Sequence, residues 1–145
     1  MKILIMENPV VLPMIRNFLN EIDRTHGGCS DLIICKNMPE AEICLKDANL
    51  AIIDLDDGGN KLALEAVTRY KIPVIATSAL LGEGALHDTT SFCYMAKPMV
   101  KNGFEHFRLA ILQFQKLIEK KVSVTWRTEH FLEELDAGSD TCRLN

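Results

Sequence analysis

The sequence predicts an α/β protein with a doubly wound parallel sheet, and three observations support this fold class. Short apolar runs alternate with segments whose apolar residues recur at helical spacing, which is typical of β-α-β units. Polar residues close three of the apolar runs, so they should gather at one edge of the sheet. The chain has 145 residues, enough for one well-packed domain, which we place at residues 1–121.

Composition excludes several classes of protein. The hydrophobic fraction is 48% and the charged fraction 25%, which is typical of a soluble globular protein. A net charge of -4 without a basic stripe argues against nucleic-acid binding. No apolar run is long enough to span a membrane, and the N-terminal run is too short for a signal peptide. The five cysteines are odd in number and contain no CxxC, which indicates a reducing, cytoplasmic setting.

Five short apolar runs are predicted to form the strands. They cover residues 2–6, 31–35, 50–54, 72–78 and 92–96. The predicted helices lie between them, where apolar residues recur at i, i+3 and i+4. The first helix carries such a stripe from Val11 to Ile22, with Asn8 placed to cap it. A second, short helix follows Pro39, and a third contains the stripe from Ala63 to Tyr70.

The remaining segments are less regular. Residues 80–91 have weak periodicity, so any fourth helix there is short. The last helix has apolar residues on more than one face from Phe104 to Ile118, which predicts a second buried surface and a homodimer through this helix. Residues 122–145 are predicted to be a C-terminal tail with a short amphipathic helix. This tail docks back on the domain, pairs with a partner or stays mobile.

The polar residues at the predicted strand ends suggest a site. Asp54 ends the third apolar run, Ser78 the fourth, and Lys97 follows the fifth. In open α/β sheets, ligands bind outside the carboxyl ends of the strands. A carboxylate, a hydroxyl and an ammonium brought together there suit a phosphoryl group, which needs an acceptor, a donor and a counter-charge. Thr77 is a rival for the role of Ser78, because strand alternation should send only one of them into the site.

These motifs, in this order, resemble the receiver domain of response regulators, the CheY-like module of two-component signalling. The segments that carry the resemblance are Ala51-Ile52-Ile53-Asp54-Leu55, Ile72-Pro73-Val74-Ile75-Ala76-Thr77-Ser78-Ala79 and Tyr94-Met95-Ala96-Lys97-Pro98. The resemblance covers residues 1–121. It implies a flavodoxin-like fold with five parallel strands in the order 2-1-3-4-5 and five helices.

The resemblance also implies roles for the strand-end residues. Asp54 would accept a phosphoryl group from a histidine kinase or a phosphotransfer protein. Ser78 would donate a hydrogen bond to a phosphoryl oxygen, and Lys97 would supply the counter-charge. Tyr94 would be the aromatic switch that alters the surface offered to a downstream protein partner. The protein would then be a non-enzymatic signalling module.

A magnesium ion is implied near Asp54, with Glu7, Asn8 and Asp56 as its other candidate ligands. Receivers usually have two acidic residues after the first strand, whereas this chain has Glu7 and Asn8. Mg²⁺ prefers carboxylate oxygens and water, so the neutral amide should weaken metal binding. Glu7 has an alternative role as a carboxylate at a helix terminus. The loop after Asp54 also departs from the family, with Gly58-Gly59 where a Met-Pro pair is usual.

Three functions follow from these residues. The first is a stand-alone receiver in a phosphorelay, which accepts a phosphoryl group on Asp54 and signals through protein contacts. The second is a pseudo-receiver that works as an adaptor without carrying phosphate, and the Glu7-Asn8 pair motivates it. The third is a flavodoxin-like binder of a nucleotide or flavin. It is the least favoured, because no glycine-rich phosphate loop follows the first strand.

Overall fold

The computed structural model describes residues 1–56, 58–78, 87–88, 92–96 and 103–119. In that part of the chain six strands form one sheet in the order β2-β1-β3-β4-β6-β5. The strands are β1 (Lys2–Met6), β2 (Asp31–Ile34), β3 (Leu50–Asp54), β4 (Val74–Ser78), β5 (His87–Asp88) and β6 (Phe92–Ala96). The order β2-β1-β3-β4 confirms the prediction for these four parallel strands, and β6 pairs with β4 in parallel.

Strand β5 was not predicted. It pairs with β6 in the antiparallel direction, with His87 opposite Tyr94, and it lies at the edge of the sheet. It falls in the segment where at most a short helix was expected. The rest of that segment lies outside the described residues, as does the predicted tail at 122–145.

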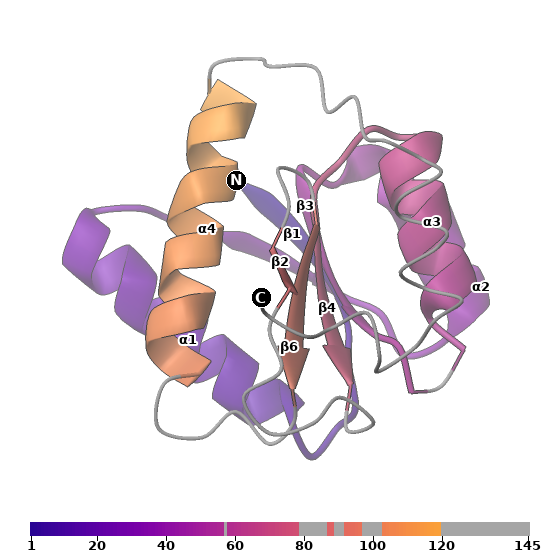
Figure 1. Ribbon diagram of the computed structural model, residues 1–145, viewed down its shortest axis with the longest axis horizontal. Coiled ribbons are helices and arrows are strands. Elements are labelled where there is room, and N and C mark those ends of the chain that lie inside the picture. The colour runs from indigo at the N-terminus through magenta and orange to yellow at the C-terminus, as the bar shows by residue number, and fades with distance from the viewer. Residues whose placement is uncertain (57, 79–86, 89–91, 97–102, 120–145) are drawn as a thin grey trace.

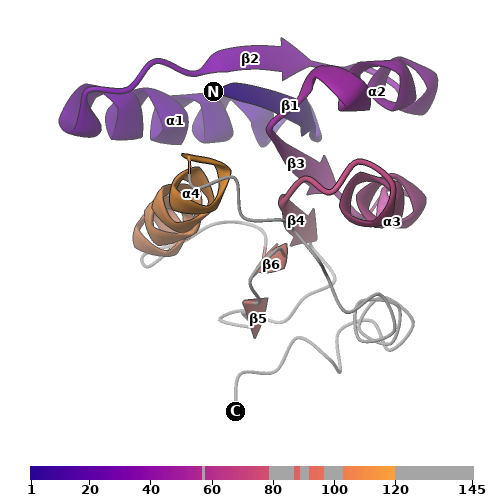
Figure 2. The ribbon, with the colours of Figure 1, turned by 90° about the horizontal axis from the view of Figure 1, so that it is seen from above.

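Helices cover both faces of the sheet, as Figures 1 and 2 show. They are α1 (Leu12–His26), α2 (Met38–Cys44) with the 3₁₀ turn η1 (Leu45–Asp47), α3 (Asn60–Thr68) and α4 (Gly103–Glu119). Helices α1 and α4 lie together on one face, and α2 and α3 lie on the other. The strands therefore have apolar residues at consecutive positions, since a sheet covered on both faces must bury both sets of side chains.

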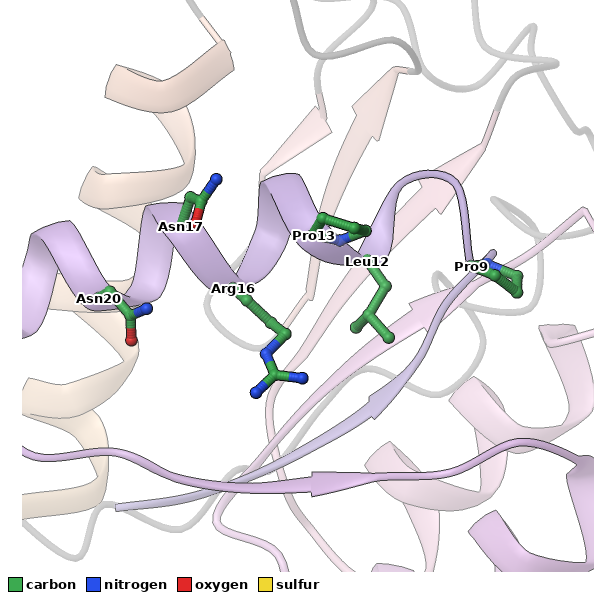
Figure 3. Close-up of a pocket in the computed structure, with 6 residues that line it drawn as sticks. All are labelled: Pro9, Leu12, Pro13, Arg16, Asn17 and Asn20. Carbon is green, nitrogen blue, oxygen red and sulfur yellow. The ribbon is translucent and has the colours of Figure 1, made fainter.

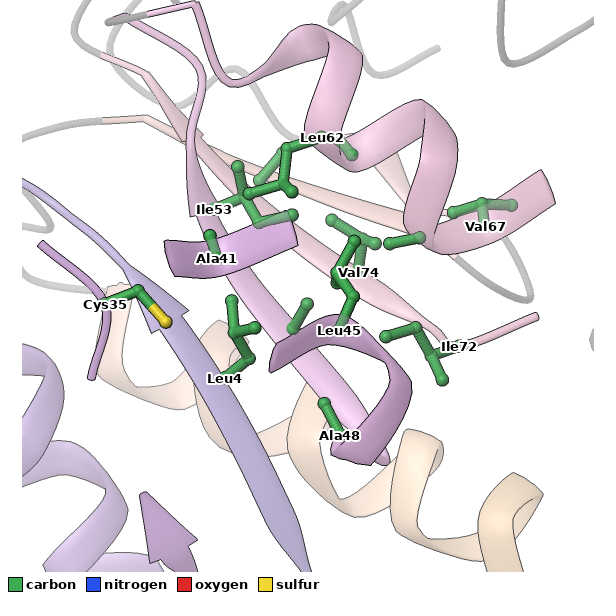
Figure 4. Packing of buried hydrophobic residues seen from close by; sticks show 14 residues of the cluster. Leu4, Cys35, Ala41, Leu45, Ala48, Ile53, Leu62, Val67, Ile72 and Val74 are labelled. Carbon is green, nitrogen blue, oxygen red and sulfur yellow. The ribbon is translucent and has the colours of Figure 1, made fainter. Parts of the chain in front are cut away.

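Alternate strand residues fill two apolar layers. On the α1 and α4 face, Ile5, Ile52 and Ile75 pack with Phe107 and Phe114 of α4. On the other face the strand residues pack against α2 and α3, and Figure 4 shows this cluster. Its labelled members are Leu4, Cys35, Ala41, Leu45, Ala48, Ile53, Leu62, Val67, Ile72 and Val74.

The start of α1 differs from the prediction. Its N-cap is Val11, without a side-chain hydrogen bond to the helix. The Asn8 side chain instead accepts a hydrogen bond from the backbone N–H of Val10, at 2.8 Å, and so closes a turn before the helix. Pro13 lies in the first turn of the helix, and this displaces the regular start beyond the reach of the Asn8 side chain.

Most of the apolar residues on the several faces of α4 pack within the domain itself. Leu112 and Leu117 pack against the core beneath α1 and α4, and Phe104 contacts the ring of Phe18. Leu109 is the large apolar residue of α4 that stays exposed, at 52%, among the side chains the structure describes. Most of the apolar surface on which the homodimer prediction rested is therefore already buried within one chain.

Three cysteines whose side chains the structure describes are free thiols: Cys29 is exposed, Cys35 buried and Cys44 partly buried. Burial, together with smaller contributions from the neighbouring Cys44 and Glu40, raises the pKa of the Cys35 thiol to about 12. Cys35 is therefore a protonated, inert part of the core, as expected for a structural thiol. In the described part of the chain, no helix is long and apolar enough to cross a membrane.

Candidate functional site

The candidate site lies at the carboxyl edge of the three central strands. Asp54 is opposite Thr77 in the register of β3 and β4. Met6 is opposite Ile53, so Glu7 follows β1 at the level of Asp54. Side chains alternate between faces, and this row therefore continues the buried isoleucines on the α1 and α4 side. The apolar core on that side ends in two carboxylates and a hydroxyl.

Asp54 is the central member of this row. It is the last residue of β3 and is only 4% exposed. Its Oδ1 atom accepts a hydrogen bond from the backbone N–H of Asp56, at 2.8 Å. A buried carboxylate must be compensated by hydrogen bonds or opposite charge, and this backbone donor also fixes the orientation of the group. The sequence prediction placed Asp54 here, and the strand end holds it in a defined position.

Glu7 reaches across the end of β3. Its Oε2 atom accepts a hydrogen bond from the hydroxyl of Thr77, and its Oε1 atom accepts one from the backbone N–H of Asn8 at 2.9 Å. Strands β1 and β4 are not neighbours, because β3 lies between them. The long side chain of glutamate makes this bond possible. Glu7 thereby links the two strands that flank Asp54.

Ser78 points to a different partner. It is 4% exposed, and its hydroxyl donates a hydrogen bond to Oδ1 of Asp56 in the loop after β3. Which of Thr77 and Ser78 would bind a phosphoryl oxygen stays a prediction. Alternation does send the two side chains to opposite faces, but each hydroxyl meets a carboxylate of the site, Thr77 that of Glu7 and Ser78 that of Asp56.

The loop after β3 is held close to the strand end. The backbone N–H of Leu55 donates to the carbonyl of Thr77 at 2.9 Å, which extends the pairing of β3 and β4. Gly58 has a φ angle of 80°. A Cβ atom on Gly59 would lie 2.1 Å from the carbonyl oxygen of Asp54, so only glycine fits there. The sequence analysis noted Gly58-Gly59 only as a departure; a glycine pair directly before a helix was the signal for this close approach.

The predicted magnesium ligands make hydrogen bonds with neighbouring groups. Among the described residues, no group of three or more His, Cys, Asp or Glu side chains is placed to hold a metal ion. Both oxygens of Glu7 accept hydrogen bonds, the Asn8 oxygen accepts one from Val10, and Oδ1 of Asp56 accepts one from Ser78. Mg²⁺ requires several oxygens directed at one point. The magnesium site at these residues stays a prediction.

Two further residues of the predicted site are Tyr94 and Lys97. Tyr94 lies in β6, opposite Ala76 of β4, and the structure describes its backbone but not its side chain. Its switching role is therefore untested. Lys97 lies outside the described residues, so its position facing Asp54 stays a prediction.

An open surface pocket of about 330 Å³ lies along α1 (Figure 3). It is lined by Pro9, Leu12, Pro13, Arg16, Asn17 and Asn20. None of the carboxylates or hydroxyls described above contributes to it, so this pocket is separate from the strand-end site.

No protein-family model matches the chain, and no curated protein is similar to it at a significant level. Among solved structures, the chain is similar to the crystal structure of HP1043, an orphan response regulator of H. pylori. The two are 14% identical, the match covers 79% of this chain and 95% of that chain, and the TM-score is 0.52. At this identity the likeness concerns the fold. The chain has a response-regulator receiver fold, in agreement with the resemblance carried by its motifs.

Proposed function

We propose that this protein is a receiver-type signalling module that accepts a phosphoryl group on Asp54 and acts through protein contacts. The observation that carries the proposal is the position of Asp54. It is a buried carboxylate at the end of the central strand, between the ends of β1 and β4, and it is oriented by the N–H of Asp56. The receiver fold supports the same function.

The proposed chemistry is a phosphoryl transfer. A carboxylate oxygen of Asp54 attacks the phosphorus of a phosphohistidine on a kinase or phosphotransfer protein. The new O–P bond forms as the P–N bond breaks, and the electron pair of that bond returns to the imidazole. The product is an acyl phosphate on Asp54. Its added charge at the strand ends would shift a two-state equilibrium and change the affinity for a downstream protein.

The experiment is intact-mass spectrometry after incubation with acetyl phosphate, with and without Mg²⁺. The wild type should gain one phosphoryl group, and Asp54→Ala should gain none. Asp47→Ala is the matched control, because Asp47 is an exposed aspartate in η1 that takes no part in the site; it should be labelled like the wild type. Failure of the wild type to gain mass under both conditions would refute the proposal.

A specific observation also favours the adaptor that carries no phosphate. The hydroxyls of Thr77 and Ser78 are already engaged by the protein's own carboxylates, Glu7 and Asp56. In an adaptor these bonds would fix one permanent conformation of the strand ends. Such a protein would show no mass gain, and Asp54→Ala would bind a downstream partner as tightly as the wild type.

A further inference from the structure

We propose that the carboxylate of Asp56 is an internal latch on Ser78, which holds this hydroxyl until a phosphoryl group on Asp54 displaces it. The inference rests on the proposed function and adds a regulatory role for Asp56, which the resemblance gives only as a candidate metal ligand. Its basis is the hydrogen bond from the Ser78 hydroxyl to Oδ1 of Asp56.

The two partners differ in freedom. Ser78 is the last residue of β4, is 4% exposed, and is opposite Ala96 in the register with β6. Asp56 lies in the loop between β3 and α3 and is exposed to solvent. The hydroxyl is therefore placed by a buried strand, and the carboxylate by an exposed loop.

Asp56 also contacts the phosphoacceptor itself. Its backbone N–H donates to Oδ1 of Asp54 at 2.8 Å, while its side chain accepts from Ser78. One residue thus connects Asp54 to the hydroxyl that would bind the phosphoryl group. A substitution of the Asp56 side chain can remove the bond to Ser78 and leave the backbone bond to Asp54 in place.

The competition follows from the chemistry of the hydroxyl. A serine side chain has a single O–H donor, so Ser78 cannot give its proton to Asp56 and to a phosphoryl oxygen at the same time. A phosphoryl group on Asp54 would also bring negative charge next to the Asp56 carboxylate, and the like charges would repel. Both effects favour an exchange in which Ser78 leaves Asp56 for the phosphoryl group.

The first test measures the latch in the unphosphorylated protein. A double-mutant cycle with Asp56→Ala and Ser78→Ala should show a coupling of about 3- to 10-fold in the unfolding equilibrium constant, as for an ordinary net hydrogen bond. The matched control pairs Asp56→Ala with Thr77→Val. It should show no coupling, because Thr77 donates to Glu7. If the two substitutions change the unfolding equilibrium constant independently, so that the coupling is 1-fold, the latch proposal is wrong.

The second test separates the latch from simple charge repulsion. With acetyl phosphate, Asp56→Ala should raise the phosphorylated fraction several-fold when Ser78 is present and should have little effect in the Ser78→Ala background. An equal rise in both backgrounds would mean that Asp56 acts by charge alone, and the latch would be wrong. If no variant, including the wild type, gains a phosphoryl group, the proposed function fails, and the double-mutant cycle alone decides whether Asp56 holds Ser78.

Discussion

The carboxylate of Glu7 accepts a hydrogen bond from the hydroxyl of Thr77 across the end of the strand that carries Asp54. Thr77 is completely buried, and Glu7 is partly buried. The bond adds a side-chain link between two strands that share no backbone hydrogen bonds.

Thr77→Val should therefore destabilise the protein. The substitution keeps the shape of the side chain but removes the donor, which leaves the Glu7 oxygen without this hydrogen bond. We expect a loss of about 1–2 kcal/mol in the free energy of unfolding, measured by urea denaturation. Thr25→Val is the control, because Thr25 is exposed and bonds only to backbone carbonyls in its own helix; its effect should stay within about 0.5 kcal/mol. Equal effects of the two variants would contradict the Glu7–Thr77 bond.

The two glycines after Asp54 should respond differently to alanine. At Gly59 the new Cβ would meet the Asp54 carbonyl oxygen at 2.1 Å and Cγ2 of Ile53 at 2.8 Å, so the backbone must shift. At Gly58 no atom of the described residues lies within 4 Å of such a Cβ, and the cost comes from the φ of 80°. We expect about 1–2 kcal/mol for Gly58→Ala and a larger loss, about 3 kcal/mol, for Gly59→Ala. Thermal and urea unfolding would measure both, and the reverse order would refute the close approach at Gly59.

The cysteines should differ in their reactivity. The buried Cys35 thiol, with its pKa raised to about 12, should resist alkylation in the native protein at pH 8, whereas the exposed Cys29 should react quickly. Peptide mapping after iodoacetamide treatment measures this, and unfolding in urea should abolish the difference. Because the folded protein holds the Cys35 proton more tightly than the unfolded chain, this thiol contributes stability that is present below about pH 9 and is lost as the pH rises toward 12. Rapid labelling of Cys35 in the native state would contradict its burial.

Two residues of α4 provide a test of how the helix docks. Phe114 is 1% exposed and packs in the core, so Phe114→Ala should cost about 3–5 kcal/mol of stability. Leu109 is 52% exposed, and Leu109→Ser should change stability by no more than about 0.5 kcal/mol.

The same variant, Leu109→Ser, tests the predicted homodimer by light scattering. If the wild type is a dimer through α4, Leu109→Ser should lower its mass toward that of a monomer. A dimer that this variant leaves intact would exclude a contact centred on Leu109.

Asn8→Asp would restore the acidic pair that receivers usually have after the first strand. The added carboxylate lies next to Glu7 and should raise the affinity for Mg²⁺, which prefers charged oxygen ligands. Saturable changes in amide chemical shifts during a Mg²⁺ titration would measure this affinity. Asn17→Asp, an exposed site on α1, is the control for added charge alone. Equal Mg²⁺ affinity in the two variants would show that position 8 does not contribute a ligand.

The local sequence pattern was enough to predict most of the strands and helices and the strand ends at which polar residues lie. Apolar runs and helical spacings are local properties, so they predicted β1 and β3 at their observed bounds and the presence of α1, although not its first residue. The placement of Asp54 and Ser78 at strand ends followed from the same pattern, and the order of the first four strands followed from the resemblance to receivers.

Only the tertiary structure decided which of these groups bond to one another. The Glu7–Thr77 bond joins residues 70 positions apart on strands that are not neighbours, and the Ser78–Asp56 bond depends on how the loop folds back after β3. The antiparallel pairing of β5 was likewise invisible in the local pattern, and the glycine pair before α3 did not indicate that Gly59 lies against the Asp54 carbonyl. Such contacts depend on the three-dimensional path of the backbone, and a periodicity along the chain carries no information about that path.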